Sequence, residues 1–207
     1  MTKSEHAIKF RRLLAGLILS ACPALGAGEL EELIKAGEQG DAGVQFLLGN
    51  RYDHGQGMAE NNAEAVRWYL LAAQQGHASA QYYLGHKYAR GDGVAKDTGA
   101  AVHWLREAAG QGHAAAQYQL GALYFDGKEA LEDKVEAARW FRPAAEQGHA
   151  VAQYYLGYMY SRGEGIPRDD AEAIRWYRLA AERGHTGAQE RLREYPENQE
   201  PARGPDR

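Results

Sequence analysis

One spacing dominates this sequence, because the same residue types return every 36 positions. The segment AQYYLG occupies 80–85 and again 152–157, and AQYQLG occupies 116–121. A fixed period of this length is typical of solenoids, in which each unit buries its apolar face only against its neighbours. The positions in register are Gln45, Gln81, Gln117, Gln153 and Gln189; Leu48, Leu84, Leu120, Leu156 and Leu192; Tyr52, Tyr88, Tyr124 and Tyr160; and all 4 tryptophans, Trp68, Trp104, Trp140 and Trp176.

Each unit is predicted to form two helices, as the unit 78–113 illustrates. Ala80, Leu84 and Tyr88 are four residues apart, which places them on one apolar stripe of a first helix. Gly91 and Gly93 are expected to end that helix in a turn. We expect the tryptophans to be buried, and the glycine that follows Leu84 to let a neighbouring helix approach. Side chains that cap helix N-termini precede the second helices at Asn61, Asp97, Asp133 and Asp169. The second helix should bury a stripe of Ala101, Trp104, Ala108 and Ala109 and end at Gly112.

The consensus A-x-A-Q-Y-x-L-G-x-x-Y-x-x-G-x-G, followed by D and by A-x-x-W-Y/F-R-x-A-A-x-x-G-H, resembles the Sel-one-like repeat (SLR), a relative of the tetratricopeptide repeat with a longer unit. The resemblance covers residues 42–185, and the third unit departs from it by lacking the second turn glycine. It implies an all-α fold, a right-handed α-solenoid of stacked helix-turn-helix repeats. In such solenoids the concave side, lined by the first helices, is the binding side.

The chain divides accordingly. The predicted segments are a signal peptide at 1–28, an N-terminal half-repeat or cap helix at 29–41, repeats at 42–77, 78–113, 114–149 and 150–185, a C-terminal cap helix at 186–195 and a disordered tail at 196–207.

The N-terminal segment has the pattern of a secretory signal. Lys3, Lys9, Arg11 and Arg12 precede an apolar run at 13–21, and small residues follow. A helix of this run would span roughly 13 Å, too short for a bilayer core of about 30 Å. The segment LSAC at 19–22 resembles the lipoprotein box and makes Cys22 a candidate lipidation site.

Export to the periplasm is therefore predicted, with a membrane tether if Cys22 is acylated. Two alternatives stay open: the signal is cut after Gly26 or Ala27, which removes Cys22, or neither event takes place.

Composition and motif spacing argue against several kinds of site. A net charge of −4 without a basic run gives no support for nucleic-acid binding. The 1 cysteine lies in the signal segment, no nucleophile–base set is evident, and we predict no catalytic residue, no metal site and no cofactor. Neighbouring helices pack about 8–10 Å apart, whereas two zinc-bound nitrogens both lie about 2 Å from the ion. The recurring histidines are therefore predicted to be turn residues, at His77, His113, His149 and His185.

The Gly-x-Gly segments at 55–57, 91–93 and 163–165 are predicted to be helix-ending turns rather than phosphate-binding loops. They follow helices rather than strands, and no Gly-Lys-Ser/Thr comes after them.

Residues that vary between units on the first helices are the candidates for recognition. Aromatic residues and arginine are enriched among binding hot spots. The predicted partner-binding residues on the concave face are Asn50, His54, Tyr83, His86, Arg90, Tyr155, Tyr158 and Arg162.

The favoured function is a non-enzymatic protein–protein interaction scaffold of the bacterial cell envelope, with a protein or peptide partner. The alternative is an envelope enzyme or small-ligand binder acting on peptidoglycan fragments or β-lactams. The sequence leaves the oligomeric state open.

Overall fold

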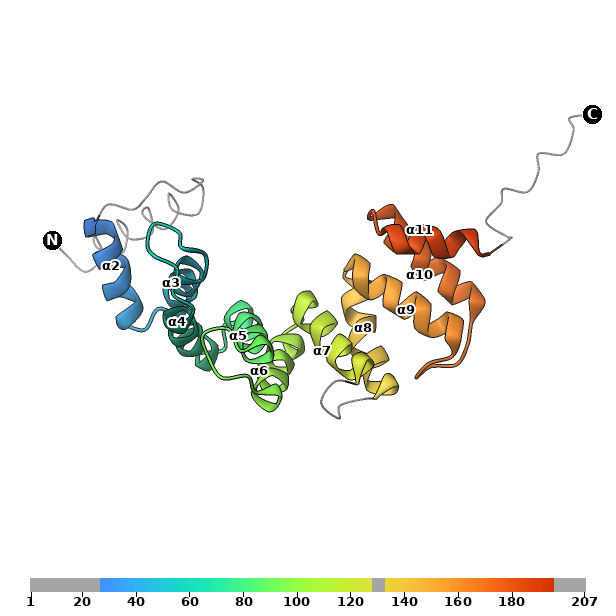
Figure 1. Ribbon diagram of the computed structural model, residues 1–207, viewed down its shortest axis with the longest axis horizontal. Coiled ribbons are helices and arrows are strands. Elements are labelled where there is room, and N and C mark those ends of the chain that lie inside the picture. The colour runs from blue at the N-terminus through green and yellow to red at the C-terminus, as the bar shows by residue number, and fades with distance from the viewer. Residues whose placement is uncertain (1–26, 128–132, 196–207) are drawn as a thin grey trace, which may run out of the picture.

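The computed structural model describes residues 27–127 and 133–195. This part of the chain forms ten helices and no strand (Figure 1). The prediction of an all-α fold is confirmed, whereas those for Cys22 and for the tail at 196–207 concern residues outside the described part. The helices are α2 (Ala27–Glu38), α3 (Ala42–His54), α4 (Asn62–Gln74), α5 (Ala78–Arg90), α6 (Thr98–Gly110), α7 (Ala114–Asp126), α8 (Lys134–Glu146), α9 (Ala150–Arg162), α10 (Asp170–Glu182) and α11 (Thr186–Arg193).

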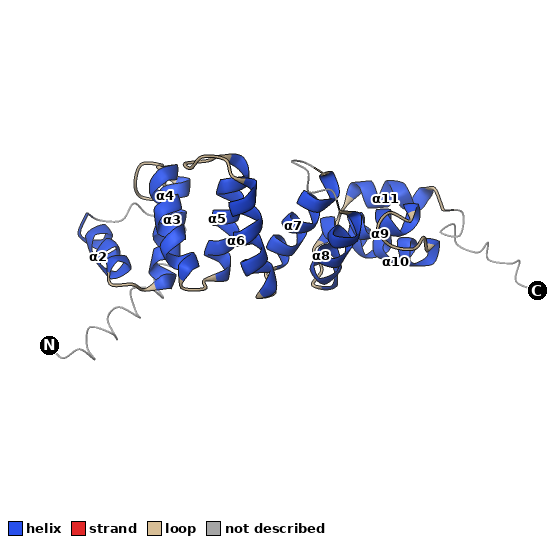
Figure 2. Cartoon of the chain, turned by 90° about the horizontal axis from the view of Figure 1, so that it is seen from below, coloured by secondary structure: helices blue, strands red, loops and turns tan. Residues whose placement is uncertain are grey.

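The helices stack in chain order. Each first helix packs on the second helix of its own repeat, and each second helix packs on the first helix of the next repeat. Figure 1 shows these pairs along a curved path, with α3 and α5 on the inner side of the curve and α4 and α6 on the outer side. Figure 2 shows the helices and loops from a second direction. Among residues 27–127 and 133–195, the structure contains no helix that could span a lipid bilayer. The arrangement is the predicted solenoid of helix pairs.

The predicted caps set the helix ends. Asp97 accepts a hydrogen bond from the backbone N–H of Ala100 at 2.9 Å, and Asn61, Asp133 and Asp169 cap the other second helices in the same way. Gly91 ends α5 with φ of 79°, a left-handed conformation that a residue without a Cβ adopts readily. The predicted turn at the end of the first helix is therefore confirmed.

The residue that follows each tryptophan is buried in every repeat, although no prediction was made for it from the sequence. Trp68 and Trp176 are buried, but Trp104 and Trp140 are only partly buried, so the prediction for the tryptophans is correct for two of the four. The next residue is buried in every repeat, with an exposed fraction of 0–1% at Tyr69, Leu105, Phe141 and Tyr177.

Gly85 explains this deep burial. A Cβ on Gly85 would lie 2.8 Å from the Leu105 Cγ atom, closer than carbon atoms pack. The glycine of the first helix therefore makes room for the residue that follows the tryptophan, which is Leu105 in this repeat. The predicted close approach of a neighbouring helix at this glycine is confirmed, and Leu105, for which no prediction was made, is the side chain that comes close.

The recurring glutamines form a hydrogen-bonded series through the stack. Gln81 is buried and donates to the Ala73 carbonyl of the preceding repeat at 3.1 Å. Its side-chain oxygen accepts from Gln111, at the end of the second helix of its own repeat, at 2.7 Å. The fourth repeat carries Arg183 at the position of Gln111, and the side-chain oxygen of Gln153 has no hydrogen-bond partner among the described residues.

The second glycine of the interhelical loop is a contact between repeats. A Cβ on Gly93 would overlap the carbonyl oxygen of Asn62, the first residue of α4 in the preceding repeat. Gly165 approaches the carbonyl oxygen of Lys134, at the start of α8, in the same manner. The loops of the second and fourth repeats therefore close against the preceding helix pair.

Candidate interaction surface

The four recurring histidines are structural. Each lies in the turn between repeats, as predicted, and caps the next first helix by accepting a backbone N–H at its Nδ1 atom over 3.2–3.3 Å. Each imidazole also stacks on an aromatic ring of the preceding first helix, with centroids 4.5–4.8 Å apart. Burial lowers the pKa of His77, His113 and His149, which keeps their rings neutral and able to accept. In the described ranges no group of three or more His, Cys, Asp or Glu side chains could hold a metal ion.

Two of the five residues predicted in the first two repeats contact one ring. Tyr83 is partly buried and stacks on Tyr69, with centroids 5.4 Å apart. The Tyr69 hydroxyl donates to the Asn50 side chain at 3.1 Å. Tyr83 and Asn50 therefore both contact Tyr69, a ring that the sequence did not single out.

The remaining predicted residues of these two repeats are less enclosed. Arg90 is exposed and pairs with Asp92 at 3.0 Å. His54 is also exposed, and its Nδ1 atom lies 2.9 Å from the Asn50 carbonyl. His86 is partly buried, and burial, together with the neighbouring Arg90, lowers its pKa.

A buried ion pair lies beneath this group, and sequence reasoning missed it. The Lys87 ammonium group donates to the Asp53 carboxylate and, at 2.6 Å, to the side-chain oxygen of Asn62. Only 8% of the Lys87 side chain and 12% of the Asp53 side chain are exposed. The equivalent positions in the third and fourth repeats are apolar, Leu123 and Met159. The pair therefore distinguishes the first junction between repeats from the later ones.

The predicted residues of the fourth repeat form a second group. Tyr155 stacks on Phe141 at 5.2 Å and packs edge-on against Phe125 at 5.3 Å. Tyr158 also packs edge-on against Phe125, and the Arg162 guanidinium lies 5.7 Å from the Tyr158 ring centre. The aromatic rings are thus fixed by packing, while Arg162 is exposed.

The structure gathers the predicted residues into these two groups. The first group lies on α3 and α5, the second lies on α9, and the third repeat comes between them along the chain. Whether either group binds a partner remains a prediction.

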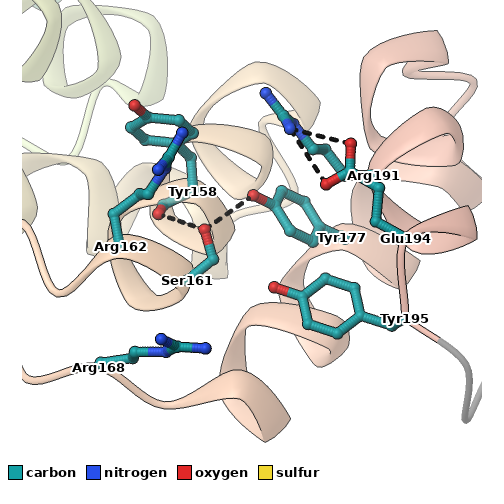
Figure 3. A pocket seen from close by; sticks show the side chains of 8 residues that line it. All are labelled: Tyr158, Ser161, Arg162, Arg168, Tyr177, Arg191, Glu194 and Tyr195. Atoms are coloured by element: carbon teal, nitrogen blue, oxygen red, sulfur yellow. Dashed lines mark hydrogen bonds and ion pairs between the residues drawn. The ribbon is translucent and has the colours of Figure 1, made fainter.

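A pocket lies at the end of the stack, beside the second group. Its volume is about 420 Å³, and side chains from α9, the following loop, α10, α11 and the residues directly after α11 line it (Figure 3). The lining residues are Tyr158, Ser161, Arg162, Arg168, Tyr177, Arg191, Glu194 and Tyr195. Two of them, Tyr158 and Arg162, belong to the predicted surface.

Three arginines from three segments give the pocket its chemistry. Arg168 donates to both carboxylate oxygens of Asp170, at 3.1 and 2.9 Å, and Arg191 donates to both oxygens of Glu194, at 3.0 and 3.1 Å. The Tyr154 hydroxyl and the Glu194 carboxylate raise the pKa of Arg191.

The hydroxyl groups of the pocket are held near its centre. The Ser161 hydroxyl donates to the Tyr158 carbonyl at 2.7 Å and lies 3.4 Å from the Tyr177 hydroxyl (Figure 3). Burial raises the pKa of Tyr177 to about 12, so its hydroxyl stays protonated at neutral pH. The pocket therefore combines cationic groups with neutral donors.

Arg191 and Glu194 escaped the sequence analysis because residues 186–195 were interpreted only as a polar cap. The 36-residue spacing could have identified both residues as candidates. Arg191 follows Tyr155 by one period and Glu194 follows Tyr158 by one period, so both stand at positions that vary on the first helices.

Comparison with known proteins agrees with this architecture. The Sel1 repeat model matches residues 42–77, 78–113, 114–149 and 150–185. A search of the curated proteins finds no match. Among solved structures, a protective antigen present in uropathogenic Escherichia coli strains, displaying an SLR fold, is 40% identical with a TM-score of 0.75. A Sel1 repeat protein from Oxalobacter formigenes is 41% identical with a TM-score of 0.72.

The extent of these likenesses is partial. The alignments cover 79% and 78% of this chain, but only 35% of the E. coli protein and 47% of the Oxalobacter protein. A sel1 repeat protein from Klebsiella pneumoniae is 25% identical over 78% of this chain and 81% of its own, with a TM-score of 0.51. On these matches the chain belongs to the Sel1 repeat family, whose solenoids commonly serve as protein-interaction scaffolds.

Proposed function

We propose that this chain is a non-enzymatic scaffold of the bacterial cell envelope that binds a protein or peptide partner through the concave face of its repeats. The observation that carries the proposal is that recurring and varying positions of the first helices differ in their exposure to solvent. Residues that recur in every repeat are buried in packing, such as Leu84 and Gln81, while the varying positions Arg90 and Arg162 reach solvent.

The aromatic residues of the same face support this assignment. Tyr83 and Tyr155 are held in place by stacking on Tyr69 and Phe141. A side chain that is already ordered loses little conformational entropy when a partner binds. Tyrosine and arginine are among the residue types enriched at binding hot spots.

Site-specific crosslinking tests the proposal in the native cell. A photoreactive amino acid at Arg90, the last residue of α5, should crosslink one discrete partner. The same probe at Arg139 of α8 is the matched control, because that side chain is 75% exposed and lies on a second helix. Arg90→Glu should reduce capture of the partner, and Arg139→Glu should not. Equal capture from both positions would contradict a specific concave site.

We also propose that the chain is exported and tethered through an acylated Cys22. The basic flank, the apolar run and the segment LSAC support this proposal. Cell fractionation and mass spectrometry test it: the native chain should enter the membrane fraction with a lipid mass on Cys22, and Cys22→Ala should release it. A soluble chain that begins after Ala27 would contradict the tether while leaving export intact.

A further inference from the structure

The pocket at the end of the stack exists because two residues differ from those at the preceding junction. Between the third and fourth repeats, Phe125 and Tyr155 pack against each other, with centroids 5.3 Å apart. One period later, Ser161 and Arg191 occupy the same two positions. Serine is much smaller than phenylalanine, and the Arg191 side chain extends to the Glu194 carboxylate, so no pair of packed rings forms here. Both residues line the pocket of about 420 Å³.

The lining carries an excess of positive charge. Arg162, Arg168 and Arg191 face the pocket, and Glu194 is the one carboxylate in its lining within the described residues. Asp170 pairs with Arg168 from outside the lining, and the Tyr158 hydroxyl donates to Glu164 at 3.5 Å. These two outer carboxylates lower the positive potential of the pocket and so weaken its attraction for an anion, while the lining itself keeps its excess of positive charge.

The existing ion pairs leave the arginines available to a ligand. In the pair of Arg168 with Asp170 the side chains are 67% and 47% exposed, and in the pair of Arg191 with Glu194 they are 36% and 61% exposed. Exposed ion pairs contribute little to stability, so exchanging one carboxylate for another costs little. Arg162 makes no ion pair with any residue in the described ranges; its guanidinium lies over the Tyr158 ring.

We propose that this pocket binds an acidic side chain, glutamate or aspartate, of the partner, with its carboxylate held by the guanidinium groups of Arg168 and Arg191. The planar guanidinium matches the two oxygens of a carboxylate, as Arg168 already demonstrates by binding Asp170 through its Nε and Nη2 atoms. Arg191 contacts both oxygens of Glu194 through its Nη1 atom. The volume falls within the range of small-ligand sites, which is enough for a side chain and its adjoining backbone. The inference rests on the proposed function in taking the ligand to be a protein segment.

Titration with defined peptides, followed by NMR on the purified chain, tests the inference. The probes are acetyl-Ala-Glu-Ala-amide, its uncharged counterpart acetyl-Ala-Gln-Ala-amide, and inorganic phosphate. The Glu peptide should shift amide signals of residues 158–168 and 191–195 and bind at least about tenfold tighter than the other two, because a charge-assisted contact is lost in the Gln peptide.

Three variants make the result specific. Arg168→Gln and Arg191→Gln should each weaken binding of the Glu peptide about tenfold, since each removes one charged donor. Arg175→Gln is the matched control, because Arg175 forms a similar exposed ion pair with Glu172 on α10 but does not line the pocket. Circular dichroism should show the same helix content in all three.

The outcomes distinguish a failure of the carboxylate site in the pocket from a failure of the proposed partner site on the concave face. Equal binding of the Glu and Gln peptides, or unchanged affinity in both pocket variants, would overturn the carboxylate site. Tighter binding of phosphate would overturn it in favour of a phosphate group. If the Glu peptide fails to bind while crosslinking at Arg90 succeeds, the pocket inference alone is wrong. If the peptide binds but Arg90 captures nothing, the concave-face proposal is the one that fails.

Discussion

Replacing Arg183 by glutamine should stabilise the chain. The side-chain oxygen of Gln153 is buried without a hydrogen-bond partner among the described residues. In the three preceding repeats a glutamine 30 residues further on donates to the equivalent oxygen, at 2.7, 2.7 and 2.8 Å. Arg183→Gln places the same donor in the fourth repeat, so the missing bond should form.

The expected change in the free energy of unfolding is the difference between a gain, the new hydrogen bond, and a loss, the packing of the Arg183 side chain. An unsatisfied buried acceptor costs about 1–3 kcal/mol, and a formed hydrogen bond contributes about 0.5–1.5 kcal/mol net. Against this, the Arg183 guanidinium packs over Gly148, where a Cβ would lie 2.9 Å from the Nη2 atom, and this contact is lost. We expect a net gain of about 1 kcal/mol, which corresponds to roughly 2–4 °C in Tm for a chain of this size.

Urea unfolding followed by circular dichroism measures the effect. The opposite substitution in the third repeat serves as the control. Gln147→Arg removes the donor to Gln117 in the third repeat and should destabilise by a similar amount. Hydrogen exchange should localise each change to its own repeat, since solenoid units interact mainly with their neighbours. If both variants unfold at the wild-type urea concentration, the glutamine series contributes nothing net and the reasoning is refuted.

Three further predictions concern the interior. Burial lowers the pKa of His113, as it does for His77 and His149, so the unfolded chain binds more protons than the folded chain and stability should fall as the pH drops below about 6.5. His113→Asn keeps a cap that does not titrate, so urea titrations should show a weaker pH dependence by the share due to His113. Lys87→Met should cost about 3–5 kcal/mol because it strands the buried Asp53, whereas adding Asp53→Ala should restore most of the loss in chemical denaturation; equal stability of the single and double variants would contradict this. Gly121→Leu should cost about 1–3 kcal/mol or more by calorimetry, because even its Cβ would lie 2.7 Å from the Phe141 ring, and an unchanged Tm would contradict the close approach.

Local rules made the helix ends predictable. A capping residue such as Asp97 needs only the neighbouring backbone N–H groups to act, so its type and position in the repeat were sufficient. The choice between Trp104 and Leu105 was not predictable in this way, because both recur with the same period. Which of the two faces the glycine depends on how far the second helix is rotated against the first, and periodicity does not encode that rotation.

The candidate surface was predictable as a set of positions but not as a shape. Variation between units pointed to Tyr158 and Arg162, and both lie on the part of the surface that the pocket occupies. The pocket itself depends on the combined volume of Ser161 and Arg191, which lie on different helices. A single sequence gives each residue type but not whether two distant ones leave space between them.

The contact made by Gly93 limits how such a chain can change in length. Interhelical loops at a surface usually tolerate insertions. Here the loop after α5 lies against the start of α4, so an added residue would force adjoining units apart. Insertions and deletions of complete repeats are then tolerated best. This offers a mechanical reason why every repeat within residues 42–185 has the same length of 36 residues.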